Sequence, residues 1–108
     1  MMNWYPEMLR GQTAVIAGVC RKMSIGAVIA RSLAKVGFNI FTTYFRPYDA
    51  TMPWGSQDNE ALEIVGELQE LGVEAAGLEL DLSRPTAPAK LFAVVRERFG
   101  TANILINN

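Results

Sequence analysis

The residues best suited to chemistry lie in one loop, AGVCRKMSIG from Ala17 to Gly26, which follows an apolar run and opens a helical pattern. Gly18 permits a sharp turn, Gly26 lets the backbone approach a ligand closely, and Ser24 can cap a helix or donate its hydroxyl to a phosphate. A helix that starts here presents unpaired N–H groups and the positive end of its dipole to an anion. The loop is a candidate phosphate site. The alternative is that its glycines serve only turn and packing, since neither G-x-G-x-x-G nor the Walker pattern is present.

The elements on either side must hold this loop in place. Thr13–Ala17 is an apolar run without alternation, which is typical of a strand buried on both faces of a parallel sheet. After the loop, Gly37 is placed to end a helix whose apolar residues recur at helical spacing, namely Ile25, Val28, Ile29, Leu33 and Val36. Strands are then predicted at 38–44, 74–80 and 103–107, and helices at 61–71 and 86–99. This β-α-β-α-β-α-β order predicts an α/β fold, a doubly wound parallel sheet with helices on both faces.

One connection, residues 45–57 (FRPYDATMPWGSQ), is longer than the usual two to six residues or so of an α/β loop. Long loops of this kind are commonly functional lids or family insertions. A surface insertion packed by Trp54 is the alternative. Ser56 or Asp58 is expected to cap the helix that follows, and Gly72 to end it.

Composition excludes several classes of protein. With 108 residues the chain is at most one small domain, and a net charge of −1 with a pI near 5.4 leaves no basic stripe for nucleic acid. There is no histidine and only one cysteine, Cys20, so zinc clusters and Cys-His pairs are excluded within the chain. The polar start and the lack of a long apolar run indicate neither signal peptide nor membrane helix. We therefore expect a cytoplasmic protein, with Cys20 as a small filler residue.

Three motifs, at the ends of three alternating strands, resemble the amino-terminal half of the short-chain dehydrogenase/reductase family. That family has T-G-x-x-x-G-x-G after the first strand, Asp-Val or Asp-Leu after the third, and Asn-Asn-Ala-Gly after the fourth. Here the chain has the glycine loop from Ala17 to Gly26, then Asp81-Leu82, then Asn107-Asn108. The resemblance runs from about Gln12 to the end. It implies a Rossmann-type sheet with strand order 3-2-1-4 and makes residues 1–108 the first part of one NAD(P)-binding domain.

The resemblance also implies roles for single residues. Gly18 and Gly26 match the first and last family glycines, while Ser24 stands where the middle glycine usually is. Asp81 would accept a hydrogen bond from the adenine amino group beside the Leu82 backbone. The alternative is that Asp81 caps the turn towards Ser83. Asn107 would brace the sheet at the edge of the cofactor cleft, or it is a plain strand-end asparagine.

The end of the second predicted strand indicates which cofactor is used. NAD-binding folds usually place an acid there for the ribose 2′-hydroxyl, but this chain has Thr43, Tyr44 and Phe45 followed by Arg46. Arg21 and Lys22 of the glycine loop can approach Arg46, and such a cluster suits the 2′-phosphate of NADP. The alternative is that all three cations are solvated. The prediction is NADP(H) over NAD(H).

The family's catalytic tyrosine, lysine and serine belong to its second half and match no residue here. We therefore expect a fragment of an NADP(H)-dependent oxidoreductase that acts on a small carbonyl or alcohol, from a parent that forms homo-oligomers. Lys22 and Ser24-Ile25 also look like the enoyl-acyl-carrier-protein reductase branch, whereas Asn107-Asn108 is similar to the branch with 3-oxoacyl-acyl-carrier-protein reductases. A non-catalytic dinucleotide-binding module is the second hypothesis. A Rossmann-like methyltransferase is disfavoured, because it would need an acid where Tyr44 and Phe45 stand.

Overall fold

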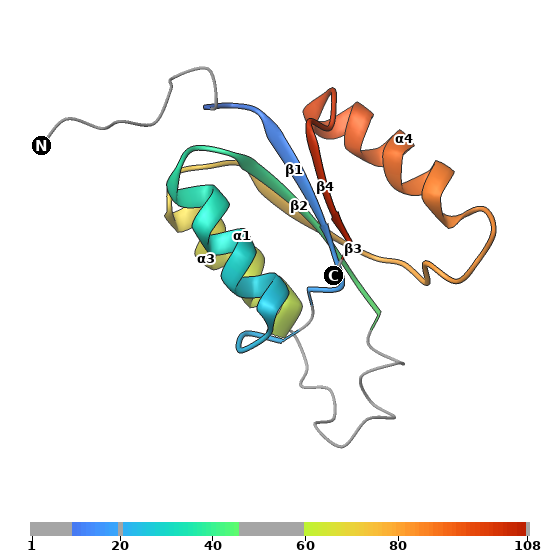
Figure 1. The fold of residues 1–108 in the computed structure, drawn as a ribbon, viewed down its shortest axis with the longest axis horizontal. Coiled ribbons are helices and arrows are strands. Elements are labelled where there is room, and N and C mark those ends of the chain that lie inside the picture. Colours follow the sequence, from blue (N-terminus) through green and yellow to red (C-terminus); the bar gives the residue numbers. More distant parts are fainter. Residues whose placement is uncertain (1–9, 20, 46–59, 108) are drawn as a thin grey trace, which may run out of the picture.

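The computed structural model describes residues 10–19, 21–45 and 60–107. These residues form a four-stranded parallel sheet with three helices packed against it (Figure 1). In chain order the elements are β1 (Thr13–Ala17), α1 (Ile25–Lys35), β2 (Asn39–Tyr44), α3 (Glu60–Glu70), β3 (Ala75–Glu79), α4 (Ala87–Phe99) and β4 (Ile104–Asn107). Every strand and helix expected from the sequence is present, and the α/β prediction is confirmed.

The strands lie in the order β3-β2-β1-β4, which confirms the predicted 3-2-1-4 arrangement. All pairings are parallel, and Val15 at the centre is level with Phe41 on one side and Leu105 on the other. All five residues of β1 are buried, as its uninterrupted apolar character indicates. Because the strands are parallel, the segments that follow β1, β2 and β3 emerge at the same edge of the sheet.

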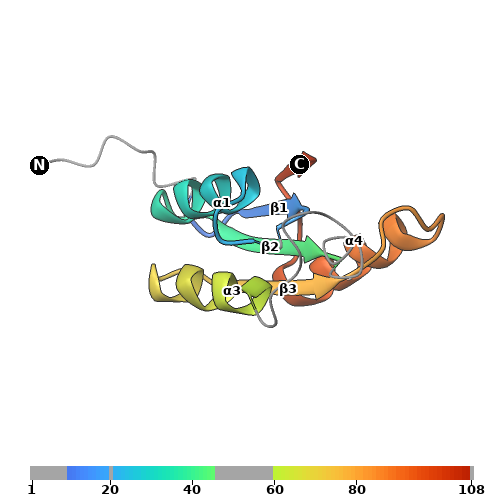
Figure 2. The ribbon, with the colours of Figure 1, turned by 90° about the horizontal axis from the view of Figure 1, so that it is seen from below.

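Helices cover both faces of the sheet. Helices α1 and α3 lie side by side over one face, and α4 covers the other (Figures 1 and 2). Alternate strand residues supply the two cores: Ile16 and Ile40 face α1 and α3, whereas Val15 and Phe41 face α4. The Phe41 ring meets Phe99 of α4 edge-on, with ring centres 5.9 Å apart.

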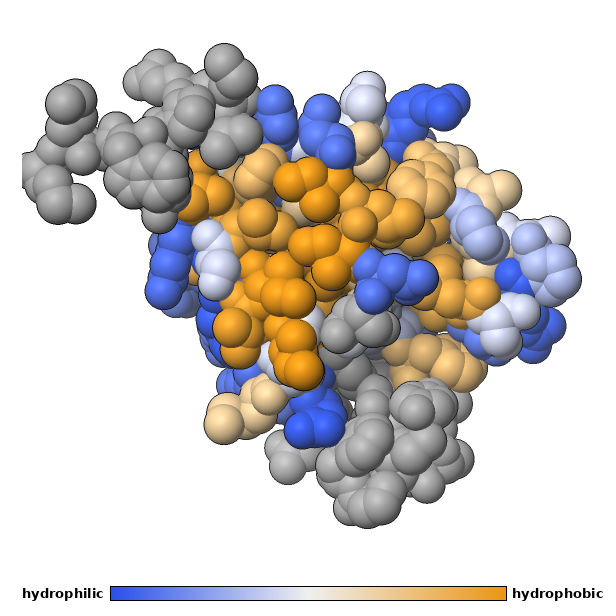
Figure 3. Space-filling model, viewed as in Figure 1, coloured by the Kyte–Doolittle hydropathy of each residue, from blue (hydrophilic) through white to orange (hydrophobic). Residues whose placement is uncertain are grey.

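The buried side of α1 differs from the predicted apolar stripe. Ile25 and Val28 are 73% and 56% exposed, while Ile29, Leu33 and Val36 are partly buried. Small residues form the fully buried surface of the helix, namely Gly26, Ala27, Ala30 and Ala34. Short side chains let α1 lie close to the sheet, while its larger apolar residues stay partly or largely exposed. Apolar side chains gather over α1 on this side of the molecule (Figure 3).

Glycines define the ends of helices and one close contact. The predicted ends at Gly37 and Gly72 are confirmed, since both have positive φ, 104° and 97°. Gly77 lies in β3 directly under α3, where an added Cβ would come within 3.2 Å of a Val65 methyl group and 3.0 Å of the Thr42 hydroxyl. A larger side chain at this position would press against α3, which explains why the strand has a glycine here. Residues 46–59, which include Trp54, Ser56, Asp58 and most of the predicted insertion, lie outside the described residues.

Candidate functional site

The glycine loop leaves β1 through a left-handed turn and is hydrogen-bonded to the end of β2. Gly18 has φ +79°, a conformation that favours glycine, so the expected turn is confirmed. Its amide donates to the Thr43 hydroxyl oxygen at 3.2 Å, and the Val19 amide donates to the Thr43 carbonyl at 2.8 Å. Thr43 is buried, and both of its oxygens hold the loop. In the sequence Thr43 stands out only as a position without an acid, so this second role was not predicted.

Ser24 caps helix α1, which is one of the two roles expected of it. Its backbone is extended, with φ −81° and ψ 159°, and its hydroxyl oxygen accepts from the Ala27 amide at 3.1 Å. The Ser24 amide donates in turn to the Arg21 carbonyl at 3.1 Å, which closes a tight turn before the helix. Because the cap uses an oxygen lone pair, the Ser24 hydroxyl hydrogen can still be donated to a phosphate.

The amides of the loop fall into two groups. Those of Gly18, Val19 and Ser24 are bonded within the protein, and the Lys22 amide donates to Glu60 Oε1 at 2.6 Å. Across the described residues, three amides at the start of α1 have no protein acceptor, those of Met23, Ile25 and Gly26. Unpaired N–H groups in the first turn of a helix attract anions. The part of the loop suited to a phosphate is therefore its helical end.

Lys22 lies against α3. Its ammonium pairs with Glu63 Oε2 at 2.5 Å, and this hydrogen-bonded carboxylate raises the pKa of Lys22 above its ordinary value. The predicted approach of Lys22 and Arg21 to Arg46 involves a residue outside the described ones. Within the described part of the chain, the partner of the Lys22 side chain is thus a carboxylate of α3.

Tyr44 ends β2 with its side chain in the core. The residue is 9% exposed and packs with Ala61 of α3, while its carbonyl accepts from the Leu80 amide at 2.9 Å. No acidic side chain stands at this strand end in the described residues, since Thr43 precedes Tyr44 and Phe45 follows it. The strand end therefore offers a ribose no carboxylate from these positions.

Asp81, just beyond β3, makes the turn-capping contacts that were one of its two predicted roles. Its Oδ1 accepts from the Ser83 hydroxyl at 2.6 Å and from the Ser83 amide at 3.0 Å. Oδ2 lies 3.7 Å from Arg84 Nε. The Ser83 hydrogen bonds hold the pKa of Asp81 below its ordinary value. Leu82 beside it is 39% exposed. A carboxylate engaged in this way keeps its negative charge at the edge of the sheet.

The expected bracing by Asn107 is not found among the described residues. Asn107 is exposed at the end of β4, level with Ala17, and makes no side-chain hydrogen bond there. A different asparagine, Asn103, braces the sheet. Its side-chain Oδ1 accepts from the Thr13 main-chain amide at 2.9 Å, and its own main-chain amide donates to the Thr13 carbonyl at 2.9 Å. Asn103 joins the opposite end of the strands, because it precedes β4 and Asn107 ends it.

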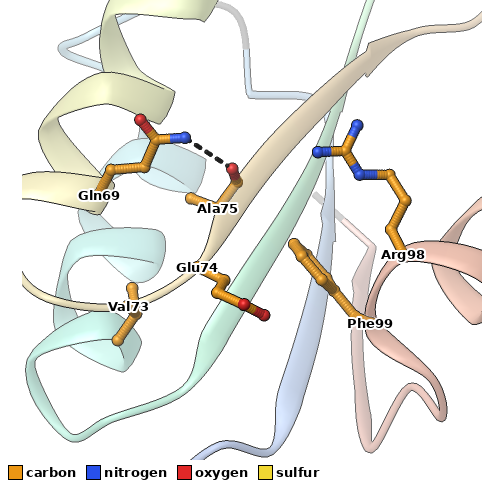
Figure 4. A pocket seen from close by; sticks show the side chains of 6 residues that line it. All are labelled: Gln69, Val73, Glu74, Ala75, Arg98 and Phe99. Carbon is orange, nitrogen blue, oxygen red and sulfur yellow. Dashed lines mark hydrogen bonds between the residues drawn. The ribbon is translucent and has the colours of Figure 1, made fainter.

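A separate hollow of about 370 Å³ lies away from this edge (Figure 4). It is bounded by the end of α3, the start of β3 and the end of α4, and its lining residues are Gln69, Val73, Glu74, Ala75, Arg98 and Phe99. Gln69 Nε2 donates across it to the Ala75 carbonyl at 3.0 Å. Since Ala75 begins β3, the hollow is at the amino end of the strands and belongs to a different part of the molecule from the glycine loop.

The described part of the chain contains neither a cluster of metal-ligating side chains nor a membrane-spanning helix. No group of three or more histidine, cysteine or acidic side chains could hold a metal ion there. None of the helices in residues 10–19, 21–45 and 60–107 has the length and apolar character needed to cross a membrane.

The chain is similar to known dehydrogenases over most of its length. It is 35% identical over 101 residues to the uncharacterized oxidoreductase YgcW of Escherichia coli, covering 93% of this chain and 33% of that protein. It is 34% identical over 99 residues to the L-rhamnose 1-dehydrogenase (NADP(+)) of Thermoplasma acidophilum, covering 92% and 34%. The chain thus spans about a third of the length of these curated relatives. No protein-family model matches it.

Solved structures agree with the observed fold. A putative dehydrogenase from Burkholderia cenocepacia with bound NADP is 30% identical, with a TM-score of 0.76 over 92% of this chain and 34% of that one. A short-chain dehydrogenase from Oenococcus oeni is 29% identical, with a TM-score of 0.75 over 92% and 38%. Both alignments cover nearly all of the present chain and little more than a third of the other protein.

Proposed function

Because the chain belongs to the short-chain dehydrogenase/reductase family, we propose that it binds a nicotinamide adenine dinucleotide at the edge of the sheet where β1, β2 and β3 end. The whole protein would be an oxidoreductase that moves a hydride between the nicotinamide and a carbonyl or alcohol carbon of a small molecule. This chain would supply the adenosine and diphosphate side of the cofactor site. We assign no catalytic residue within it.

One observation supports the proposal above the others: the start of α1 leaves the amides of Met23, Ile25 and Gly26 without a protein acceptor, at the point where the family binds a diphosphate. The left-handed Gly18 and the Ser24 cap hold these amides in place. The residues present therefore fit an anionic group, and the Ser24 hydroxyl would add a further donor to it.

Other residues would contact the rest of the cofactor. Asp81 and the Leu82 backbone would border the adenine, with Asp81 Oδ2 as the acceptor because Oδ1 is used by Ser83. Tyr44 would support the ribose pocket from the core, and Asn107 would line the cleft through its exposed amide. When bound, the nicotinamide supplies or accepts the hydride. This chain's residues bind and orient the other end of the molecule.

NADP(H) is proposed as the preferred cofactor. No carboxylate stands at the end of β2, where Thr43, Tyr44 and Phe45 lie, so the usual acceptor for an unphosphorylated ribose is missing from these positions. Arg21 and Lys22 of the loop, together with Arg46, would bind the 2′-phosphate. A cytoplasmic location, a homo-oligomeric parent and a place in the branch with 3-oxoacyl-acyl-carrier-protein reductases are parts of the same proposal. The alternative is the enoyl-acyl-carrier-protein reductase branch, because the chain is also 29% identical over 102 residues to such a reductase of Rickettsia bellii.

Calorimetric titration of the chain with NADPH, NADH and ATP tests the proposal. We expect saturable binding of both dinucleotides, tighter for NADPH. ATP, which shares the adenosine and phosphates but lacks the 2′-phosphate, should bind about as weakly as NADH. Equal affinities or tighter NADH binding would contradict the cofactor preference. Binding of neither dinucleotide would contradict the proposed function itself.

A further inference from the structure

Helix α3 is bonded directly to the tip of the glycine loop. Glu60 Oε1 accepts from the Lys22 main-chain amide at 2.6 Å, and Glu63 Oε2 lies 2.5 Å from the Lys22 ammonium. The two glutamates are three residues apart and so lie on the same side of the helix. A single residue of the loop is therefore held twice, at its backbone and at its charge.

The helix that makes these contacts is itself firmly positioned. Ala61, between the two glutamates, packs on Tyr44 at the end of β2. Ile64 and Leu68 are fully buried against the sheet. One turn further, Glu67 Oε2 accepts from Arg31 Nε of α1 at 3.1 Å. Since α3 is fixed by its core contacts, the position of its first turn fixes the position of Lys22.

These contacts give the two carboxylates different effects on a bound dinucleotide. Glu60 bonds to a neutral amide and so holds the loop in one conformation, whichever cofactor binds. Glu63 pairs with the cation that a 2′-phosphate would need. The Lys22 and Glu63 side chains are 41% and 53% exposed, so their ion pair can be exchanged for another at modest cost.

We propose that the first turn of α3 tunes the cofactor site, with Glu60 positioning the glycine loop and Glu63 weakening the preference for NADP(H) by competing with the 2′-phosphate for Lys22. This inference rests on the proposed function, because it requires a dinucleotide at the loop. It adds one positioning residue, Glu60, and one specificity-determining residue, Glu63, which follow the 45–57 connection and lie 38 or more positions from the loop residue they contact.

Four variants separate the two effects, and each is measured by calorimetry with NADPH and with NADH. Glu63→Gln is expected to raise the ratio of NADPH to NADH affinity about fivefold, the effect of one partly exposed ion pair. Glu60→Ala is expected to weaken both cofactors about equally, by roughly fivefold, and Glu60→Gln to restore much of this because its amide oxygen still accepts. Glu67→Gln is the matched control on the same helix and should leave the ratio within about twofold of the parent.

Amide hydrogen exchange of the cofactor-free chain supplies a second readout. Glu60→Ala should accelerate exchange at the Lys22 amide, whereas Glu67→Gln should not. An unchanged Lys22 exchange rate in Glu60→Ala would overturn the positioning role without any reference to cofactor. A Glu63→Gln ratio equal to that of the parent, or to that of Glu67→Gln, would overturn the tuning role. If the parent chain binds neither dinucleotide, the proposed function fails first, and this is seen before any variant is made.

Discussion

Replacing Thr43 by valine tests whether the end of β2 holds the glycine loop. The two side chains have nearly the same shape, so Thr43→Val keeps the packing of a side chain that is 1% exposed and removes only its hydroxyl. The bond lost is the one from the Gly18 amide, at 3.2 Å. The Val19 amide keeps its bond to the Thr43 carbonyl at 2.8 Å.

The size of the effect follows from these contacts. A net hydrogen bond contributes about 1 kcal/mol to stability, and the cost rises when a partly buried donor loses its acceptor. We therefore expect Thr43→Val to lower the free energy of unfolding by about 1 to 2 kcal/mol. Because the loop is then less well ordered before binding, we also expect dinucleotide affinity to fall about fivefold.

Urea denaturation followed by circular dichroism measures the stability, and amide exchange at Gly18 and Val19 locates the change. Thr42→Val is the control: Thr42 is equally buried in the same strand, but its hydroxyl lies 3.5 Å from the Ala76 carbonyl, too far for a strong bond, so a loss below about 0.5 kcal/mol is expected. Thr43→Ser should retain slow exchange at Gly18. If Thr43→Val costs no more than Thr42→Val, or if Gly18 exchanges at the same rate in both, the Thr43 hydroxyl does not hold the loop.

Three further changes have outcomes set by single contacts. Ser24→Ala removes the cap of α1 and should cost about 1 kcal/mol in denaturation experiments, whereas Ser32→Ala, on the exposed side of the same helix, should be near neutral; equal costs would contradict the capping role. Gly77→Ala places a methyl group 3.2 Å from Val65 under α3 and should lower stability by about 1 kcal/mol, so a stabilised variant would show that α3 moves away freely. Asp81 has a lowered pKa, so it stabilises the fold above its unfolded pKa of about 3.9 and loses this effect as the pH falls through the folded value. In Asp81→Asn the urea midpoint should therefore decrease less as the pH falls than it does in the parent chain. An unchanged dependence of the midpoint on pH would show that Asp81 does not stabilise the fold in this way.

The elements were predictable because their signals are local. The buried strand Thr13–Ala17, the cap at Ser24 and the helix ends at Gly37 and Gly72 each depend on a few neighbouring residues, and all are found as expected. The buried side of α1 was not predictable by the same means. Hydrophobicity alone favours Ile25 and Val28, but close packing against the sheet selects the alanines of the helix for the interior.

The contacts of the site were predictable only where they join residues that are close in sequence. The Ser24 cap spans three residues and the Asp81 turn spans two, and the alternatives that named these local roles are confirmed. Thr43 and Glu60 contact the loop across 25 and 38 residues. For Glu60, no periodicity or spacing indicated that contact. For Thr43, a hydroxyl at the end of a neighbouring parallel strand was the available signal.

If the amides at the start of α1 that lack an acceptor among the described residues bind the diphosphate, removal of one of these N–H groups must weaken cofactor binding. Ile25 is the first helical residue, where proline is tolerated, and the extended Ser24 before it suits a following proline. Calorimetry of Ile25→Pro is compared with Ile25→Ala, which also trims this exposed side chain but keeps the N–H group. We predict that Ile25→Pro binds NADPH at least about tenfold more weakly than Ile25→Ala at similar unfolding stability, as expected for a lost hydrogen bond to a charged group. Equal NADPH affinities for the two variants would contradict it.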